Sequence, residues 1–169
     1  MKISEFVDGF KKSANPHKYV TEHIKCKYIP YTEKIMAANK IIAASSYIEI
    51  NGVKIFKPNT ASKYMLFVSS IIQLYTDLEY EKDDDGNSLI IEGFDLIEES
   101  GTTEIITEVI GIDVKRFNTV LKMCMDDTID QERALVPFLD TKFQAMKIGM
   151  DYLGESLKTI QEAQEQHHE

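Results

Sequence analysis

The residue types that most often carry out chemistry are sparse in this sequence and lie far apart. Its four histidines fall into two pairs, His17 with His23 and His167 with His168. Neither pair has an acidic or cysteine neighbour at the spacing typical of metal ligands. The sequence also lacks glycine-rich phosphate loops and the GxSxG and HExxH motifs of common enzyme classes. We therefore expect no catalytic residues, no cofactor and no enzymatic activity.

The two cysteines, Cys26 and Cys124, lie 98 residues apart and form no CxxC motif. Both fall on apolar faces of the elements expected around them, which favours inert thiols in a core over nucleophiles. Reduced cysteines of this kind are typical of a cytoplasmic protein.

One acidic segment resembles the loop of an EF-hand calcium site. The candidate ligands are Glu81, Asp83, Asp85, Asn87 and Glu92, which take loop positions 1, 3, 5, 7 and 12 around Gly86 at position 6. The segment departs from the motif at position 1, where aspartate is usual, and at position 8, where Ser88 replaces an apolar residue. A solvated turn is the alternative interpretation.

A second pattern lies near the C-terminus and favours contact with another helix. Apolar residues alternate there at spacings of four and three, the repeat of a coiled-coil seam. The candidate interface residues are Leu139, Phe143, Met146, Met150, Leu153 and Leu157. The alternative is an ordinary helix packed on its own domain. Gly149 and Gly154 would weaken a helix that stood alone.

The clearest local signal is a hairpin over residues 47–56. Asn51-Gly52 is the preferred dipeptide of a type I′ turn, which joins two antiparallel strands. The register that follows pairs chemically matched side chains: Tyr47 with Phe56, Ile48 with Ile55, Glu49 with Lys54 and Ile50 with Val53. A hairpin alone is marginally stable in water. We therefore expect an alternating strand at residues 23–28 to join it, or a helix to cover it.

Helical periodicity accounts for most of the remaining chain. The spacing of apolar residues predicts helices over 3–12, 31–46, 58–80 and 89–99, a short segment over 104–110, and a helix capped by Asp113. Pro137 predicts a break or kink before a last long helix. The fold class is therefore mainly α with a small antiparallel β-hairpin or three-stranded sheet (α+β) and a long C-terminal helix. We expect a helical domain over 1–136 and the long helix over 137–163, packed on that domain or mediating self-association.

Charge is unevenly distributed along the 169 residues, whose net charge is −9. Residues 1–63 hold 11 lysines and 5 acidic residues, a net of +6, and residues 64–169 have a net of −15. Such asymmetry suits head-to-tail contact between copies or a charged partner, although the two segments could also cancel within one chain. The overall charge argues against nucleic acid as a partner.

No membrane association is expected from the sequence. It contains no run of 18 apolar residues that could span a bilayer. Glu5 and Asp8 interrupt the stretch where a signal peptide would be apolar, so we expect no export by that route.

Several segments resemble small acidic proteins encoded among the structural genes of tailed phages and prophages of Gram-positive bacteria. The residues that carry the resemblance are Tyr28–Ile35, Lys63–Phe67 continuing to Leu74-Tyr75-Thr76, Phe117–Leu121 and the long C-terminal helix. The likeness covers residues 25–160. It implies a virion component or assembly factor, such as a head–tail joining protein or a tail assembly chaperone. Its partners would be other phage structural proteins or copies of itself as a homo-oligomer. It would act in the host cytoplasm during assembly, or in the virion.

Two alternative functions remain open. An acidic phage-encoded inhibitor could imitate the phosphate backbone and block a host nucleic-acid enzyme. The residues for that role are Asp83, Asp84, Asp85, Glu92, Asp95, Glu98 and Glu99. A calcium-linked regulator built on the loop at 81–92 is the other alternative.

Overall fold

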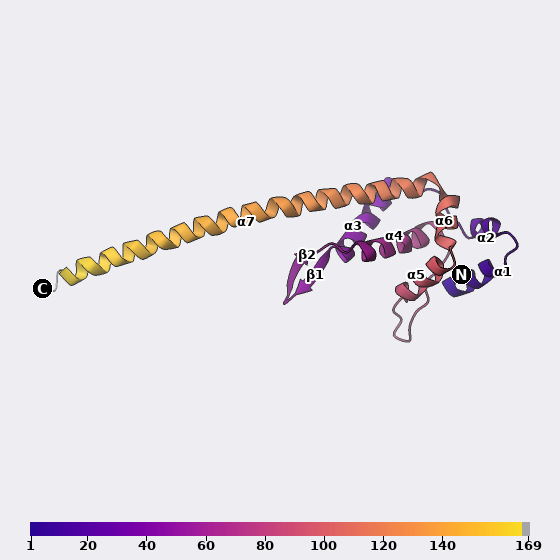
Figure 1. The fold of residues 1–169 in the computed structure, drawn as a ribbon, viewed down its shortest axis with the longest axis horizontal. Coiled ribbons are helices and arrows are strands. Elements are labelled where there is room, and N and C mark those ends of the chain that lie inside the picture. Colours follow the sequence, from indigo (N-terminus) through magenta and orange to yellow (C-terminus); the bar gives the residue numbers. More distant parts are fainter. Residues whose placement is uncertain (167–169) are drawn as a thin grey trace. The chain divides into compact units, whose positions relative to one another are not determined.

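The protein is mostly helical, with one two-stranded antiparallel hairpin and a long C-terminal helix (Figure 1). The computed structural model describes the backbone of residues 1–166, and the side chains of residues 1–135 and 138–154. The elements are α1 (Ile3–Lys12), α2 (Pro16–Glu22), α3 (Tyr31–Ser45), β1 (Tyr47–Ile50), β2 (Val53–Phe56), α4 (Thr60–Tyr75), α5 (Ile90–Glu99), α6 (Thr102–Ile110) and α7 (Ile112–Gln166). This confirms the predicted class, mainly α with a small hairpin.

The chain divides into two compact units, Met1–Asp126 and Asp127–Glu169. Helix α7 begins in the first unit and its backbone continues through the second. Of the break or kink expected before Pro137, the break is wrong, because the helix runs through this residue without interruption. A proline removes one backbone hydrogen bond from a helix, and the bonds of the turns on either side remain to hold the backbone.

The predicted hairpin is confirmed with its register. Strands β1 and β2 pair Tyr47 with Phe56, Ile48 with Ile55, Glu49 with Lys54 and Ile50 with Val53. Asn51 and Gly52 both have positive φ, 52° and 78°, as a type I′ turn requires. The Asn51-Gly52 turn therefore predicts both the place and the register of this hairpin.

The strand expected at residues 23–28 is wrong. Helix α2 ends at Glu22, and Ile24 forms an isolated bridge with Thr76 rather than joining the hairpin. The backbone N–H groups of Lys25 and Cys26 both donate to the carbonyl of Tyr75, at 2.9 and 3.4 Å. The segment is thus held by the chain leaving helix α4, which satisfies its hydrogen bonds without a third strand.

Two asparagines cap the start of helices, one of which the apolar periodicity did not predict and the other of which it predicted with different bounds. Asn15 Oδ1 accepts from Lys18 N at 3.0 Å and Pro16 occupies the first turn of α2, a helix the sequence pattern did not predict. Asn59 Oδ1 accepts from Ser62 N at 3.1 Å at the start of α4. Helix α4 ends at Tyr75, earlier than expected, because Thr76 adopts an extended backbone.

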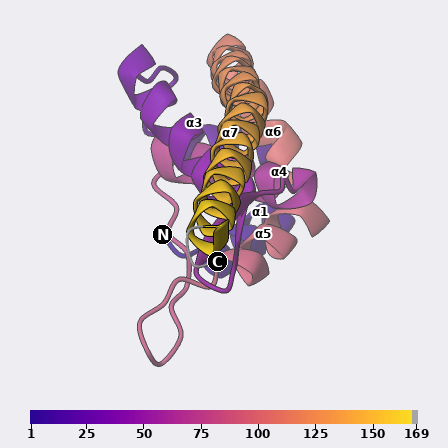
Figure 2. The same ribbon diagram turned by 90° about the vertical axis from the view of Figure 1, so that its left-hand side faces the viewer.

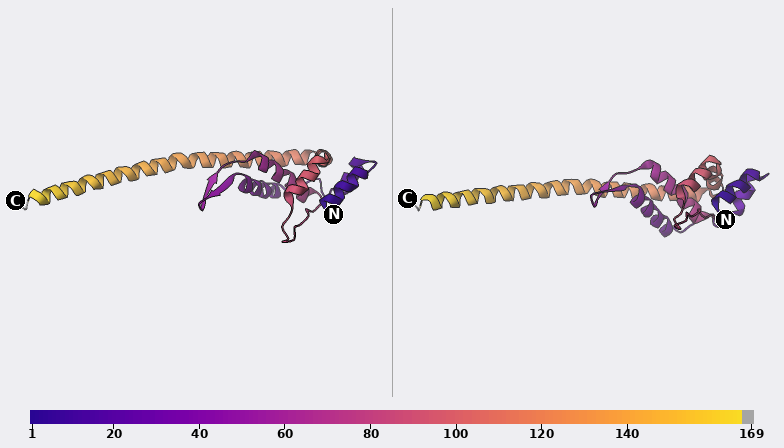
Figure 3. Two further views of the ribbon diagram at one scale, coloured as in Figure 1. Left: turned by 60° about the horizontal axis from the view of Figure 1, so that its bottom comes forward. Right: turned by 90° about the horizontal axis from the view of Figure 1, so that it is seen from below.

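The core of the first unit lies among α1 and α3 to α7, together with Val20 of α2. Helix α3 packs on α4, α1 on α5, and α2 on α6. Figure 3 shows the hairpin at one end of α4 and helices α1 and α5 at the other. The largest fully buried apolar side chains are Ile3, Phe6, Val7, Val20, Ile71, Ile72, Tyr75, Ile97, Ile106 and Phe117.

A buried ion pair joins three of these helices. Lys34 of α3 and Asp113 of α7 are each 2% exposed, and Lys34 Nζ lies 2.9 Å from Asp113 Oδ2. The same carboxylate oxygen accepts from Tyr75 Oη of α4 at 2.9 Å and from the N–H of Ile29 at 3.1 Å. Lys34 Nζ also donates to the carbonyl of Ile29 at 2.5 Å. Asp113 therefore stabilises long-range packing, and its expected role as the cap of α7 is wrong.

The surroundings of this pair favour the charged carboxylate. Burial by itself raises the pKa of Asp113, but hydrogen bonds from Lys34, the Ile29 N–H and Tyr75 outweigh burial and hold this pKa below its ordinary value. Burial, followed by the hydrogen bond to Asp113, raises the pKa of Tyr75. Tyr75 thus remains a neutral donor to a charged acceptor.

We predict that Asp113→Asn lowers the free energy of unfolding by about 3 to 5 kcal/mol, because it leaves the Lys34 ammonium buried without a counter-charge. Chemical denaturation at neutral pH measures the change. The matched control is Asp126→Asn, an exposed position on the same helix, with an expected change within about 0.5 kcal/mol. Equal effects of the two substitutions would contradict the role of the pair.

The same variant also tests how the stability contributed by Asp113 changes with pH. Since the pKa of Asp113 is lower in the folded chain, the carboxylate contributes stability above the ordinary aspartate pKa of about 4. This contribution is lost as the pH falls through the folded-state pKa. The loss of stability below pH about 4 should therefore be shallower in Asp113→Asn than in the wild-type protein.

Candidate functional site

The strongest candidate surface is the apolar stripe of α7, formed by Leu139, Phe143, Met146, Met150 and Leu153. These five side chains are between 43% and 66% exposed. Their spacing of four and three residues places them on one face of the helix. Leu157, the sixth residue predicted for this surface, lies outside the described side chains.

The stripe cannot be buried within its own unit. The backbone of residues 127–166 is a single helix, so its described side chains have no second element of that unit to pack against. In proteins, most helix stability comes from packing an apolar face. A face of leucine, phenylalanine and methionine therefore indicates a contact with another helix or surface.

The acidic loop is a hydrogen-bonded turn. Asp83 Oδ1 accepts from the N–H groups of Asn87 at 2.7 Å and Asp85 at 3.0 Å, and Asp83 Oδ2 accepts from Asn87 Nδ2 at 3.1 Å. Gly86 has a φ of 84°, a conformation that few other residues adopt. Figure 2 shows the loop before α5 as a thin trace that stands away from the helices. The turn thus has its own stabilising contacts in this conformation.

The structure does not bring the five candidate calcium ligands together. Glu81 Oε1 accepts from the N–H of Ser4 in the first turn of α1 at 2.9 Å, whereas Glu92 lies in α5. Among the described residues, no group of three or more histidine, cysteine or acidic side chains is placed to hold a metal ion. The geometry therefore gives the calcium hypothesis no support.

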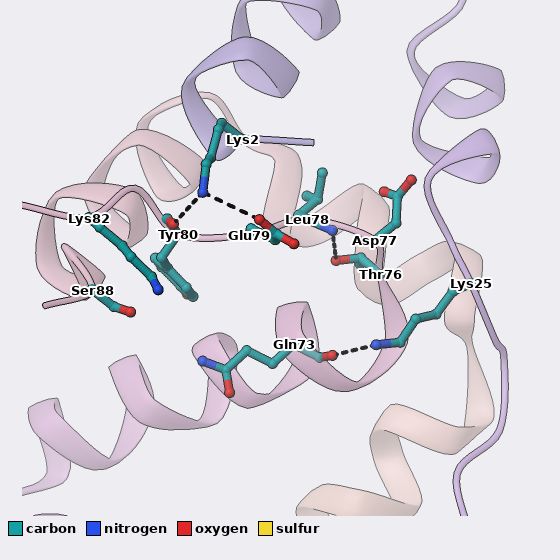
Figure 4. A pocket seen from close by; sticks show the side chains of 10 residues that line it. All are labelled: Lys2, Lys25, Gln73, Thr76, Asp77, Leu78, Glu79, Tyr80, Lys82 and Ser88. Carbon is teal, nitrogen blue, oxygen red and sulfur yellow. Dashed lines mark hydrogen bonds and ion pairs between the residues drawn. The ribbon is translucent and has the colours of Figure 1, made fainter. Parts of the chain in front are cut away.

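A polar pocket of about 450 Å³ adjoins the same region (Figure 4). Its lining residues are Lys2, Lys25, Gln73, Thr76, Asp77, Leu78, Glu79, Tyr80, Lys82 and Ser88. Lys2 Nζ contacts Glu79 Oε2 and the carbonyl of Tyr80, both at 3.3 Å, and Lys25 Nζ donates to the carbonyl of Gln73 at 2.6 Å. The Lys2 ammonium thus holds the N-terminal residues against the chain that follows α4, whereas the Lys25 ammonium contacts the last turn of α4 itself.

Sequence reasoning did not identify this pocket, because its residues come from three distant stretches. It also missed the contact of His23 Nδ1 with Asp77 Oδ1 at 3.1 Å. His17 Nε2 lies 3.7 Å from Glu108 Oε2, while His167 and His168 lie outside the described residues. Each histidine of the first unit thus lies beside one carboxylate, His17 beside Glu108 and His23 beside Asp77.

Neither Cys26 nor Cys124 forms a disulfide in the described part of the chain, and both are partly buried. Cys26 Sγ lies 3.4 Å from the carbonyl of Leu74. Cys124 lies in the part of α7 that belongs to the first unit. Neither side chain lies in the buried core, and the strand whose apolar face was expected to carry Cys26 does not form.

We predict that Asn87→Ala raises the pKa of Asp83 towards its ordinary value. The hydrogen bond from the Asn87 side chain is the largest cause of the lowered pKa, and the substitution removes that donor while leaving the backbone N–H. Carboxyl chemical shifts followed by NMR through an acid titration measure the change. Ser88→Ala is the control, since the described hydrogen bonds of the Asp83 carboxylate come from Asp85 and Asn87 and not from the Ser88 side chain. An unchanged pKa in Asn87→Ala would contradict the described turn.

Neither a membrane-spanning helix in the described part of the chain nor a similarity to known proteins suggests a function. No described helix has the length and apolar character needed to cross a membrane. Comparison with models of protein families, with curated proteins and with solved structures finds no match for this chain. The functional argument therefore rests on the residues and their geometry.

Proposed function

We propose that this chain is a non-enzymatic bacteriophage virion or virion-assembly protein that acts through protein–protein contacts. Within that class, the roles that fit are a head–tail joining component and a tail assembly chaperone. Its partners are other phage structural proteins or further copies of itself, and its place of action is the host cytoplasm during assembly or the virion.

The observation that carries the proposal is the exposed stripe of α7. Five large apolar side chains, none less than 43% exposed, follow the 3.5-residue repeat of a helix seam. A single helix has no apolar interior of its own, and exposed apolar rows of this length mark interaction sites. A role in assembly gives this row a partner to pack against.

Two features of the sequence support the same class. The segments of residues 25–160 quoted above resemble small acidic proteins of phage structural gene clusters. The +6 charge of residues 1–63 and the −15 charge of residues 64–169 supply complementary surfaces for contacts between chains. Both features favour a protein that works by surface complementarity.

A second candidate is an acidic inhibitor that imitates a phosphate backbone. Of its seven acidic residues, Asp84, Asp85, Glu92, Asp95 and Glu99 are exposed and form no ion pair with a described residue. Asp83 is engaged in the loop turn, and Glu98 accepts from Tyr64 Oη at 3.2 Å and from Thr103 Oγ1 at 2.5 Å. Such an inhibitor requires a basic host protein that it binds strongly at low salt and weakly at high salt.

We predict that Met146→Asp/Leu153→Asp abolishes self-association through the stripe. Two carboxylates in the middle of an apolar seam would have to be desolvated for the contact to form. Size-exclusion chromatography with light scattering at low and high salt measures the mass, which should fall to that of one 19.3 kDa chain wherever the stripe is the only contact.

The matched control is Ile148→Asp/Tyr152→Asp, at two apolar positions of the same helix that are 57% and 69% exposed. These positions lie off the stripe, so association should persist. Survival of the wild-type mass in Met146→Asp/Leu153→Asp would contradict the proposed interface. Loss of the folded first unit in that variant would show instead that the stripe belongs to a core.

A further inference from the structure

A groove of about 460 Å³ lies between the chain entering α3 and the first turns of α7. All of its lining residues belong to the first unit. They are Tyr28, Tyr31, Lys34, Ile112, Lys115, Arg116, Thr119, Val120 and Met123. The stripe of α7 contributes none of them, so the groove is a separate surface.

The apolar wall of the groove consists of large exposed side chains. Tyr28, Tyr31, Ile112 and Met123 are between 53% and 62% exposed. Tyrosine, methionine and arginine are enriched in protein interfaces, because they offer large contact areas with a polar end or an adaptable shape. This composition favours a protein segment as the occupant.

The floor of the groove is fixed by the buried ion pair. Lys34 Nζ lies 4.5 Å from the centre of the Tyr28 ring and is held at the same time by Asp113 and the carbonyl of Ile29. Asp113 Oδ1 is buried and has no hydrogen-bond partner among the described residues, and Arg116 Nη1 lies 4.0 Å from it. The buried pair thus contacts the Tyr28 ring through Lys34 and lies next to Arg116 through Asp113.

The rim of the groove is positive. Lys115 and Arg116 are exposed, and the Lys115 ammonium forms no ion pair with a described residue. The long contact of Arg116 with Asp113 leaves its other donors directed to solvent. An occupant with carboxylates beside an apolar side chain would match both the rim and the wall.

Helix α5 presents this combination on the surface of the same chain. Ile91 is 61% exposed, and Asp95 lies one turn further along on the same face. Glu92 and Glu99 are also exposed, and none of these three carboxylates forms an ion pair within the described part of the chain. A row of carboxylates around one exposed isoleucine complements the groove in charge and in apolar character.

We propose that the groove binds the acidic face of helix α5 from a second copy of the chain. The contact joins two different surfaces, so it is head-to-tail, and repetition either closes a ring or extends a filament. This inference rests on the proposed function in one respect, that the chain works through contacts between proteins.

The test uses the full chain carrying Met146→Asp/Leu153→Asp, so that the stripe and the groove are measured separately. In this background the groove contact should still give masses above 19.3 kDa at low salt, and high salt should reduce them. Adding either Lys115→Glu/Arg116→Glu or Glu92→Lys/Asp95→Lys should weaken the apparent association at least tenfold. Sedimentation velocity over a concentration series measures the dissociation constant.

The most direct test of the contact between groove and helix α5 is to mix the Lys115→Glu/Arg116→Glu variant with the Glu92→Lys/Asp95→Lys variant. Each retains one native surface, so the mixture should associate although neither variant does alone, and this recovery also shows that both are folded. Lys11→Glu/Lys12→Glu is the control, because it makes the same charge change on exposed positions of α1 and should leave association unchanged.

Three results would overturn the groove proposal. They are a strict monomer in the Met146→Asp/Leu153→Asp background, association that ignores both charge reversals, and a mixture that stays monomeric. A groove that instead takes an acidic segment of a different protein would appear as the first of these. The interface on which the proposed function rests fails by a different result, which is a wild-type mass that Met146→Asp/Leu153→Asp leaves unchanged before any groove substitution is added.

Discussion

The packing of the first unit depends on one buried charge pair, Lys34 with Asp113. Each charge would be costly to bury alone, so the start of α3 and the start of α7 are stable only when they lie together. Tyr75 and the backbone of Ile29 complete the hydrogen bonds of the same carboxylate and include α4 in the arrangement. Because Tyr28 and Arg116 border this pair, the interaction that holds the helices also positions the walls of the groove.

The two units differ in whether their apolar side chains are buried. In the first unit, isoleucine, valine and phenylalanine side chains of several helices bury one another. In the second, the apolar residues lie along a single helix, so the spacing that would form a core in a bundle forms a surface. Gly149 and Gly154 lower the intrinsic helix stability of this region further, which increases its need for a packing partner.

The sequence predicted the elements that local chemistry determines. Asn51-Gly52 set the hairpin register, and the positive φ of Gly101, 70°, fits the predicted end of α5. Predictions failed where distant residues decide the conformation. The alternation of apolar residues at 23–28 suggested a strand, but the N–H groups of Lys25 and Cys26 donate to the carbonyl of Tyr75 instead of to a neighbouring strand. Asp113 has the sequence context of a helix cap, and only the folded chain brings Lys34 within 2.9 Å of it.

The same distinction separates the two candidate contacts. The stripe lies within one helix, so its 3.5-residue repeat could be found in the sequence, whereas the groove combines residues 28–34 with 112–123 and exists only in the fold. The physical character of the contacts also differs, since an apolar seam tolerates salt and a charged rim does not. A chain with a single self-complementary surface stops at a dimer. Adding a head-to-tail surface allows growth beyond the dimer, which is the capacity that a component of a large assembly needs.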